Sequence, residues 1–128
     1  MEGKKVLVVE DDFFIRELYQ RALTLHGMEV VTASDGMEAI VKFDQELPDL
    51  VLLDVMLPEV SGMEVLKYIK TRIDVSKNIP VVMVSNLDTS DSIEQAMSLG
   101  AYGYRVKSEH TPVHIAQEVQ GILDKLPE

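Results

Sequence analysis

The chain has 128 residues, the size of one globular domain, so a single domain over residues 1–128 is expected. Its 12 Lys and Arg against 22 Asp and Glu give a formal net charge of −10, which disfavours direct binding to nucleic acid or to an anionic membrane. The longest apolar runs are only strand-length, no secretory signal pattern follows Met1 and no cysteine is present, so an intracellular, cytoplasmic protein is expected.

The amino-terminal part alternates strand-like apolar runs with helical patterns. The first run ends in an acidic cluster, and Asp12 of that cluster is a suitable N-cap for the helix that follows. The predicted elements are a strand at 4–9, a helix from Asp12 to about His26, a strand at 29–33 and a helix from Gly36 to about Gln45. The inward stripe predicted for the first helix is Ile15, Leu18, Ala22 and Leu25.

The apolar run at residues 49–58 carries a single carboxylate in its interior. Pro48 and Pro58 bound this run, which is typical of a strand buried on both faces. Asp54 is therefore expected at the end of the strand, where the sheet opens to water. A charge at that place is costly unless another group pairs with it, so the residues that follow the other strands are decisive.

The carboxyl-terminal part continues the alternation. Ser61 and Glu64 have the spacing of a capping box at the start of a helix. That helix carries Val65, Leu66, Ile69 and Ile73 on one side, and a strand at 81–84 that ends at Ser85 follows it. Next come a helix that is capped by Ser90 or Asp91 and runs through Leu99, and a strand at 101–106 that leads into Lys107. The last helix begins at Thr111-Pro112 and carries Ile115, Val119, Ile122 and Leu126. Five strands alternating with five helices predict an α/β fold, a parallel sheet with helices on both faces.

Polar side chains follow four of the five predicted strands. Glu10 and Asp11 follow the first, Asp54 the third, Ser85 the fourth and Lys107 the fifth. Ligands of such sheets bind beyond the carboxyl ends of the strands. Three carboxylates at this edge would repel one another unless a cation lies among them, and oxygen ligands suit Mg²⁺. Asp54 is then a suitable phosphoryl acceptor, with Lys107 and Ser85 placed to contact phosphoryl oxygens.

The chain resembles the response-regulator receiver domains of two-component signalling from Val6 to Leu126. The resemblance rests on five motifs in the right order, which are Val8-Val9-Glu10-Asp11-Asp12, Leu52-Leu53-Asp54-Val55-Met56-Leu57-Pro58, Ser61-Gly62, Val84-Ser85 and Gly103-Tyr104-Arg105-Val106-Lys107. It implies a doubly wound, flavodoxin-like (βα)5 fold with strand order 2-1-3-4-5. It also implies a cytoplasmic signalling switch rather than an enzyme, with a sensor histidine kinase or a phosphotransfer protein as the phosphoryl donor.

The same resemblance assigns roles to single residues. Asp54 would accept the phosphoryl group and bind Mg²⁺, Asp11 would bind the ion directly, and Glu10 would act through water. The backbone carbonyl of Met56 would be a further ligand. Ser85 and Lys107 would contact the phosphoryl group.

Ser85 and Tyr104 would form a conformational switch. The signal would leave through the surface of the fourth helix, the fifth strand and the fifth helix, toward a partner, an output domain or, in a homodimer, a second copy.

Several positions depart from the family pattern. Ser108 follows Lys107 where many relatives have proline, which leaves the geometry of that peptide open. Asn86 is larger than the residue often found beside the switch hydroxyl, so access to the site is expected to be tighter. Tyr102-Gly103 replaces an acidic pair common in the winged-helix subclass, which weakens any expectation of that subclass's dimer. Met56 and Leu87 are apolar where a side chain would orient a hydrolytic water, so slow loss of the phosphoryl group is expected.

Two other functions stay open at this point. One is a Mg²⁺-dependent phosphohydrolase, which the apolar Met56 disfavours because a general acid would be expected there. The other is an interaction module without phosphorylation, which the complete set of acidic residues with Lys107 disfavours. His110 and His114 flank the start of the last helix, so they are not expected to share a helical face or to form a metal-binding pair.

Overall fold

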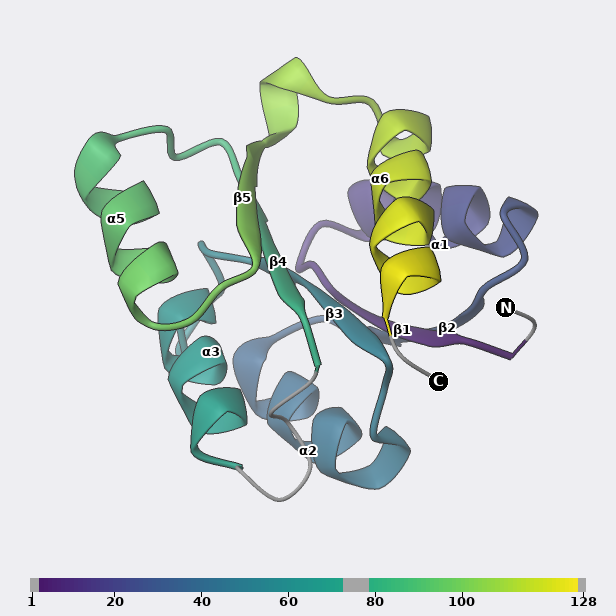
Figure 1. Ribbon diagram of the computed structural model, residues 1–128. Helices are drawn as coiled ribbons and strands as arrows, with labels where there is room; N and C mark the ends of the chain where they lie inside the picture. The colour runs from purple at the N-terminus through teal and green to yellow at the C-terminus, as the bar shows by residue number, and fades with distance from the viewer. Residues whose placement is uncertain (1–2, 73–78, 127–128) are drawn as a thin grey trace.

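Five parallel strands form one sheet in the computed structural model, which describes residues 3–72 and 79–126. The strands are β1 (Lys5–Val9), β2 (Glu29–Ala33), β3 (Leu50–Asp54), β4 (Val81–Ser85) and β5 (Gly103–Val106). Their order in the sheet is β2-β1-β3-β4-β5, and every neighbouring pair is parallel (Figure 1). The predicted fold class and strand order are confirmed.

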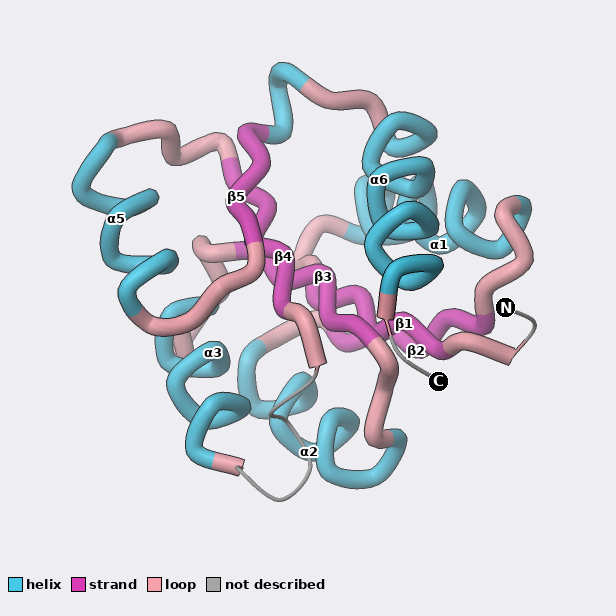
Figure 2. Tube along the Cα trace, in the orientation of Figure 1, coloured by secondary structure: helices cyan, strands magenta, loops and turns pink. Residues whose placement is uncertain are grey.

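Helices cover both faces of this sheet (Figures 1 and 2). They are α1 (Phe13–Leu25), α2 (Gly36–Glu46), α3 (Gly62–Thr71), α5 (Ser90–Ser98) and α6 (Pro112–Lys125), with a short 3₁₀ helix η1 (Lys107–Glu109) between β5 and α6. The helices α1 and α6 lie on one face, and α2, α3 and α5 lie on the other. The predicted fourth and fifth helices correspond to α5 and α6. None of the described helices is long and apolar enough to span a lipid bilayer.

Two apolar layers hold these helices to the sheet. Alternate side chains of β1, β3 and β4 point into each layer, so these central strands are buried along their whole length, apart from the first residue of β1. Phe43, Leu66 and Ile69 belong to the layer beneath α2, α3 and α5. Leu23 and Ile115 belong to the layer beneath α1 and α6. The central strands are thereby covered on both sides, whereas the edge strands β2 and β5 are only partly buried.

Several predicted helix caps are confirmed. The Asp12 side chain accepts a hydrogen bond from the Ile15 N–H at 3.1 Å, and Ser61 and Glu64 form the expected capping box. Thr111 caps α6 with proline as the next residue. The predicted cap of α5 at Ser90 or Asp91 is wrong. Thr89 is the N-cap, because its hydroxyl accepts from the Ser92 N–H at 3.2 Å.

The inward stripe predicted for α1 is wrong at two positions. The side chains of Leu18 and Leu25 are 50% and 79% exposed, whereas Tyr19, Ala22 and Leu23 are buried. This helix carries apolar residues on two adjoining stripes, and its contacts with β1, β2 and α6 decide which stripe faces inward. The predictions for Ile73 in α3 and for Pro127 after α6 lie outside the described residues.

Candidate functional site

The polar residues predicted to follow the strands lie at one edge of the sheet, and Lys107 joins two of them. Its ammonium donates a hydrogen bond to Glu10 Oε1 at 2.6 Å and to Asp54 Oδ2 at 2.9 Å. Glu10 follows β1, Asp54 ends β3 and Lys107 follows β5. The parallel register brings these three side chains together although they are far apart in the sequence.

The acidic part of this site consists of three carboxylates. Glu10 and Asp54 are only 1% and 3% exposed, whereas Asp11 is exposed to solvent. One carboxylate oxygen from each of the three lies within 4.8 Å of the others. Three oxygens at this spacing, with one residue facing water, fit Mg²⁺, which binds protein carboxylates and keeps several waters.

Burial and charge together set the protonation of this site. Burial raises the pKa of Glu10 to about 7, and the Asp54 charge adds to this effect, while hydrogen bonds from Lys107 and from the Asp12 N–H oppose it. Burial also disfavours the charge on Lys107, but the two carboxylates outweigh it and raise the pKa of this lysine. One ammonium therefore faces three carboxyl groups, and a divalent cation would compensate the remaining negative charge.

The backbone around Asp54 is held by a close approach of the loop that leads into α3. Asp54 Oδ1 accepts a hydrogen bond from the Met56 N–H at 3.1 Å, and the Gly62 N–H donates to the Val55 carbonyl at 2.9 Å. A Cβ atom on Gly62 would lie 2.0 Å from the Asp54 carbonyl oxygen, so no larger residue fits here. The Ser61-Gly62 motif pointed to this position, but its spacing alone did not show the contact.

Arg16 is a part of this site that the sequence analysis missed. Its guanidinium on α1 donates a hydrogen bond to the Glu10 carbonyl oxygen at 2.8 Å. This bond ties the first turn of α1 to the chain segment that carries the acidic residues. An arginine on an amphipathic helix looks like an ordinary solvated side chain, so no sequence signal marked it.

Ser85 and Tyr104 both contact the segment between β4 and α5. Ser85 is fully buried, and its Oγ accepts a hydrogen bond from the Leu87 N–H at 3.1 Å. The Tyr104 hydroxyl donates to the Leu87 carbonyl at 2.5 Å and lies 3.2 Å from Ser92 Oγ. The peptide groups of Leu87 thus connect the two residues predicted to form the switch.

Two of the positions that depart from the family pattern, Asn86 and Ser108, lie beside Lys107. The chain turns into η1 at Lys107, and the Lys107–Ser108 peptide is trans, since the described residues contain no cis peptide bond. Asn86 and Ser108 are exposed, and both line a cavity of about 280 Å³ that reaches Lys107. The side chain of Met56 is 61% exposed, and the predicted metal contact of its carbonyl stays a prediction.

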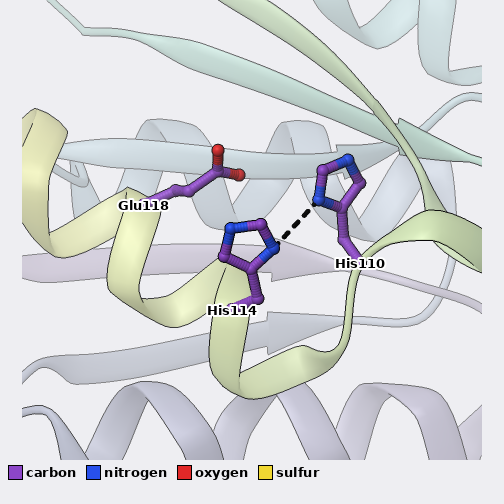
Figure 3. A group of neighbouring side chains, drawn as sticks. All are labelled: His110, His114 and Glu118. Atoms are coloured by element: carbon purple, nitrogen blue, oxygen red, sulfur yellow. Dashed lines mark hydrogen bonds between the residues drawn. The ribbon is translucent and has the colours of Figure 1, made fainter.

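His110 and His114 share no helical face, as expected, because His110 precedes α6, but their side chains nevertheless lie in contact. Their Nδ1 atoms lie 3.1 Å apart and their rings are stacked, with centroids separated by 5.0 Å (Figure 3). The turn at Thr111 folds His110 back over the first turn of α6, so the two rings meet without sharing a helical face.

Comparison with known proteins gives a consistent result. The family described as "Response regulator receiver domain" matches residues 6–120. A "Probable transcriptional regulator ycf27" of Guillardia theta is 39% identical over 121 residues, which cover 94% of this chain and 45% of that protein. The "Alkaline phosphatase synthesis transcriptional regulatory protein PhoP" of Bacillus subtilis (strain 168) is 38% identical over 121 residues, which cover 94% of this chain and 49% of that protein. The chain therefore spans about half the length of the curated relatives it matches.

Solved structures show the same likeness. The BeF3-activated N-terminal receiver domain of Klebsiella pneumoniae RstA superposes with a TM-score of 0.85 at 30% identity, covering 95% of this chain and all of that one (100%). The signal receiver domain of the putative response regulator NarL from Mycobacterium tuberculosis superposes with a TM-score of 0.86 at 29% identity, covering 98% of this chain and 99% of that one. Sequence and fold agree over nearly the whole chain, and the chain belongs to the response regulator receiver domain family of two-component signalling.

Proposed function

We propose that this chain is one receiver domain over residues 1–128 and that it works as a phosphorylation-activated switch. Asp54 would accept a phosphoryl group from the phosphohistidine of a sensor histidine kinase or phosphotransfer protein, in the cytoplasm. The observation that carries this proposal is the pair of hydrogen bonds from the Lys107 ammonium to the buried Asp54 and Glu10 carboxylates, at the open edge of the sheet. Family membership supports a signalling regulator, and the geometry supports Asp54 as the residue that reacts.

The proposed transfer uses groups that are already in place. An Asp54 carboxylate oxygen attacks phosphorus, an O–P bond forms, the P–N bond of the donor breaks, and the imidazole leaves with the electron pair and takes up a proton. Mg²⁺ held by Glu10, Asp11, Asp54 and the Met56 carbonyl would neutralise charge on the phosphoryl oxygens. Lys107 would exchange a carboxylate partner for a phosphoryl oxygen.

The proposed change of state begins at the Leu87 peptide groups. Turning the Ser85 side chain toward a phosphoryl oxygen would lengthen or break the hydrogen bond that its Oγ accepts from the Leu87 N–H. Movement of this segment would in turn release the Leu87 carbonyl from the Tyr104 hydroxyl. Phosphorylation would therefore favour a second arrangement of α5 and β5 and shift the population toward it.

We propose that the output is a protein contact on the surface of α5, β5 and α6, made by a partner, an output domain or a second copy of the chain. Direct contact with nucleic acid is not proposed, because the net charge of −10 opposes it. The relatives named as transcriptional regulators are about twice as long as the matched part, so any activity of the rest of such a protein is separate from this domain.

The test is phosphorylation by acetyl phosphate in Mg²⁺, followed by intact-mass analysis. The wild-type chain should gain one phosphoryl group that is labile to both acid and base, and Asp54→Asn should gain none. The matched control is Asp124→Asn, which removes an exposed carboxylate on α6 and should label like wild type. Labelling that persists in Asp54→Asn would contradict the proposal. Sustained turnover of phosphate esters would support the phosphohydrolase alternative instead.

A further inference from the structure

Three potential metal ligands that do not belong to the acidic cluster lie together where η1 meets α6. His110 follows η1 directly, His114 lies in the first turn of α6, and Glu118 lies one turn later (Figure 3). One ligand atom from each of these residues lies within 4.8 Å of the others. The proposed phosphoryl transfer uses none of the three.

The spacing of the two imidazoles suits a single ion. Their Nδ1 atoms are 3.1 Å apart. Two nitrogens bound at about 2.0–2.1 Å to one ion lie roughly 2.8–3.4 Å apart when the angle at the ion is between about 90° and the tetrahedral value. The observed separation falls within this interval, so the distance between the two nitrogens matches that of two ligands on one ion.

The turn before α6 holds the two histidines in this arrangement. The Thr111 hydroxyl accepts a hydrogen bond from the His114 N–H at 3.1 Å, and Pro112 fixes the first helical position. The His110 N–H donates to the Lys107 carbonyl at 3.3 Å. The backbone at both histidines is therefore held by hydrogen bonds before any ion binds.

The third ligand is oriented by a partner on β5. Arg105 Nε donates a hydrogen bond to Glu118 Oε1 at 2.9 Å. Carboxylates that bind metals are commonly held by such a hydrogen bond, which fixes their direction. Glu118 also follows His114 by four residues, so the two side chains project from the same face of α6.

We propose that His110, His114 and Glu118 form a binding site for a divalent transition-metal ion of the Zn²⁺ class, with water in the remaining coordination positions. Two imidazoles and one carboxylate favour Zn²⁺ and similar ions over Mg²⁺, which prefers oxygen ligands. The donor set therefore separates this site chemically from the acidic cluster. A bound ion would tie η1, which begins at Lys107, to the first turns of α6.

The experiment titrates Zn²⁺ into the metal-free chain in an excess of Mg²⁺, which occupies the acidic cluster. Calorimetry gives the stoichiometry and affinity, and NMR follows the imidazole signals of the three histidines. We expect one Zn²⁺ per chain, with the His110 and His114 signals shifting together. The signals of His26, which lies at the end of α1 with its Nδ1 2.9 Å from the Ala22 carbonyl, should stay unchanged.

Variants identify the ligands. His110→Gln and His114→Gln should each weaken Zn²⁺ binding by at least about 10-fold, since each removes a ligand that lies directly on the ion. His26→Gln is the matched control and should bind Zn²⁺ like the wild type. Thermal unfolding without metal checks that the variants fold, and Zn²⁺ should raise the Tm of the wild type more than that of either ligand variant.

Two results would overturn the proposal. One is stoichiometric Zn²⁺ binding that keeps its affinity in His110→Gln and His114→Gln. The other is a wild-type chain that binds Zn²⁺ no more tightly than the variant lacking both histidines, in which case the two rings form only a hydrogen bond. Neither result depends on phosphorylation of Asp54, so the two proposals are tested separately.

Discussion

Replacing Lys107 with methionine removes the cation that bonds both buried carboxylates of the site, while it keeps most of the apolar stem. In the wild type, the ammonium lies 2.6 Å from Glu10 Oε1 and 2.9 Å from Asp54 Oδ2. Removing one partner of a buried ion pair costs about 3–5 kcal/mol. Because this edge of the sheet opens to water, we expect the lower end, about 3 kcal/mol of unfolding free energy at pH 8 without Mg²⁺.

The loss in Lys107→Met should depend on pH in a defined direction. Without the ammonium, mainly the hydrogen bond from the Asp12 N–H still opposes burial and the Asp54 charge, so the pKa of Glu10 should rise above its value of about 7 in the wild type. A raised carboxyl pKa favours the protonated folded state, so the variant should be least impaired at pH 5 and should lose stability as the pH rises. Mg²⁺ should restore part of the loss at pH 8, because it supplies the missing positive charge.

Urea unfolding at pH 5 and pH 8, with EDTA or with Mg²⁺, measures these differences. The matched control is Lys42→Met, which removes a partly exposed lysine paired with Glu38 at 3.6 Å. That variant should lose less than about 1 kcal/mol at either pH. An equal loss in Lys107→Met at both pH values, or no effect of Mg²⁺, would refute the view that charge compensation is the main role of Lys107 in the unphosphorylated fold.

Three further predictions concern the same edge of the sheet. In urea unfolding, Gly62→Ala should lower the unfolding free energy by about 3 kcal/mol, because the new Cβ would lie 2.0 Å from the Asp54 carbonyl oxygen. The control Gly121→Ala lies in α6, where a Cβ meets no atom within 4 Å, and it should raise the unfolding free energy by up to about 1 kcal/mol. Wild-type stability in EDTA should fall as the pH rises from about 4.5 to about 7, because the fold raises the pKa of Glu10, and Glu10→Gln should flatten this slope. Met56→Asn should shorten the lifetime of the phosphorylated chain in Mg²⁺, because an amide can orient water; a slower decay than in Met56→Ala would contradict this.

The sheet and the main residues of the site were predictable because their signals are local. The prolines at 48 and 58 bound an apolar run, which places Asp54 at the end of a strand. The parallel topology then requires the residues that follow β1, β3, β4 and β5 to meet at one edge. Residue type and strand end were therefore sufficient to predict that Glu10, Asp54 and Lys107 are neighbours.

Features that depend on packing were not predictable. The rotation of α1 was predicted incorrectly because Leu18 and Leu25 continue one apolar stripe while Tyr19 and Leu23 continue another. The spacing of the residues is compatible with either choice. Only contact with the sheet and with α6 decides between the two stripes.

The geometry of short turns could also not be predicted from the spacing of residues in the sequence. Residues 107–109 form a 3₁₀ turn that the residue spacing did not predict. Together with the Thr111 cap, this turn brings the His110 side chain into contact with that of His114. The start of a helix between two residues is expected to keep their side chains apart. A tight turn followed by a cap instead brings the residues on either side of it into contact.

The Lys107 contacts also bear on how the chain folds. The bond to Glu10 closes a sequence separation of 97 residues, and the bond to Asp54 closes one of 53. Contacts across such long loops carry a large entropy cost and tend to form late. A nascent chain in which β1 and β3 have paired but β5 has not would hold two adjacent carboxylates without their lysine. We therefore expect the complete candidate phosphoryl-acceptor site to form only when the edge strand β5 has joined the sheet. Incompletely folded molecules should then not accept a phosphoryl group.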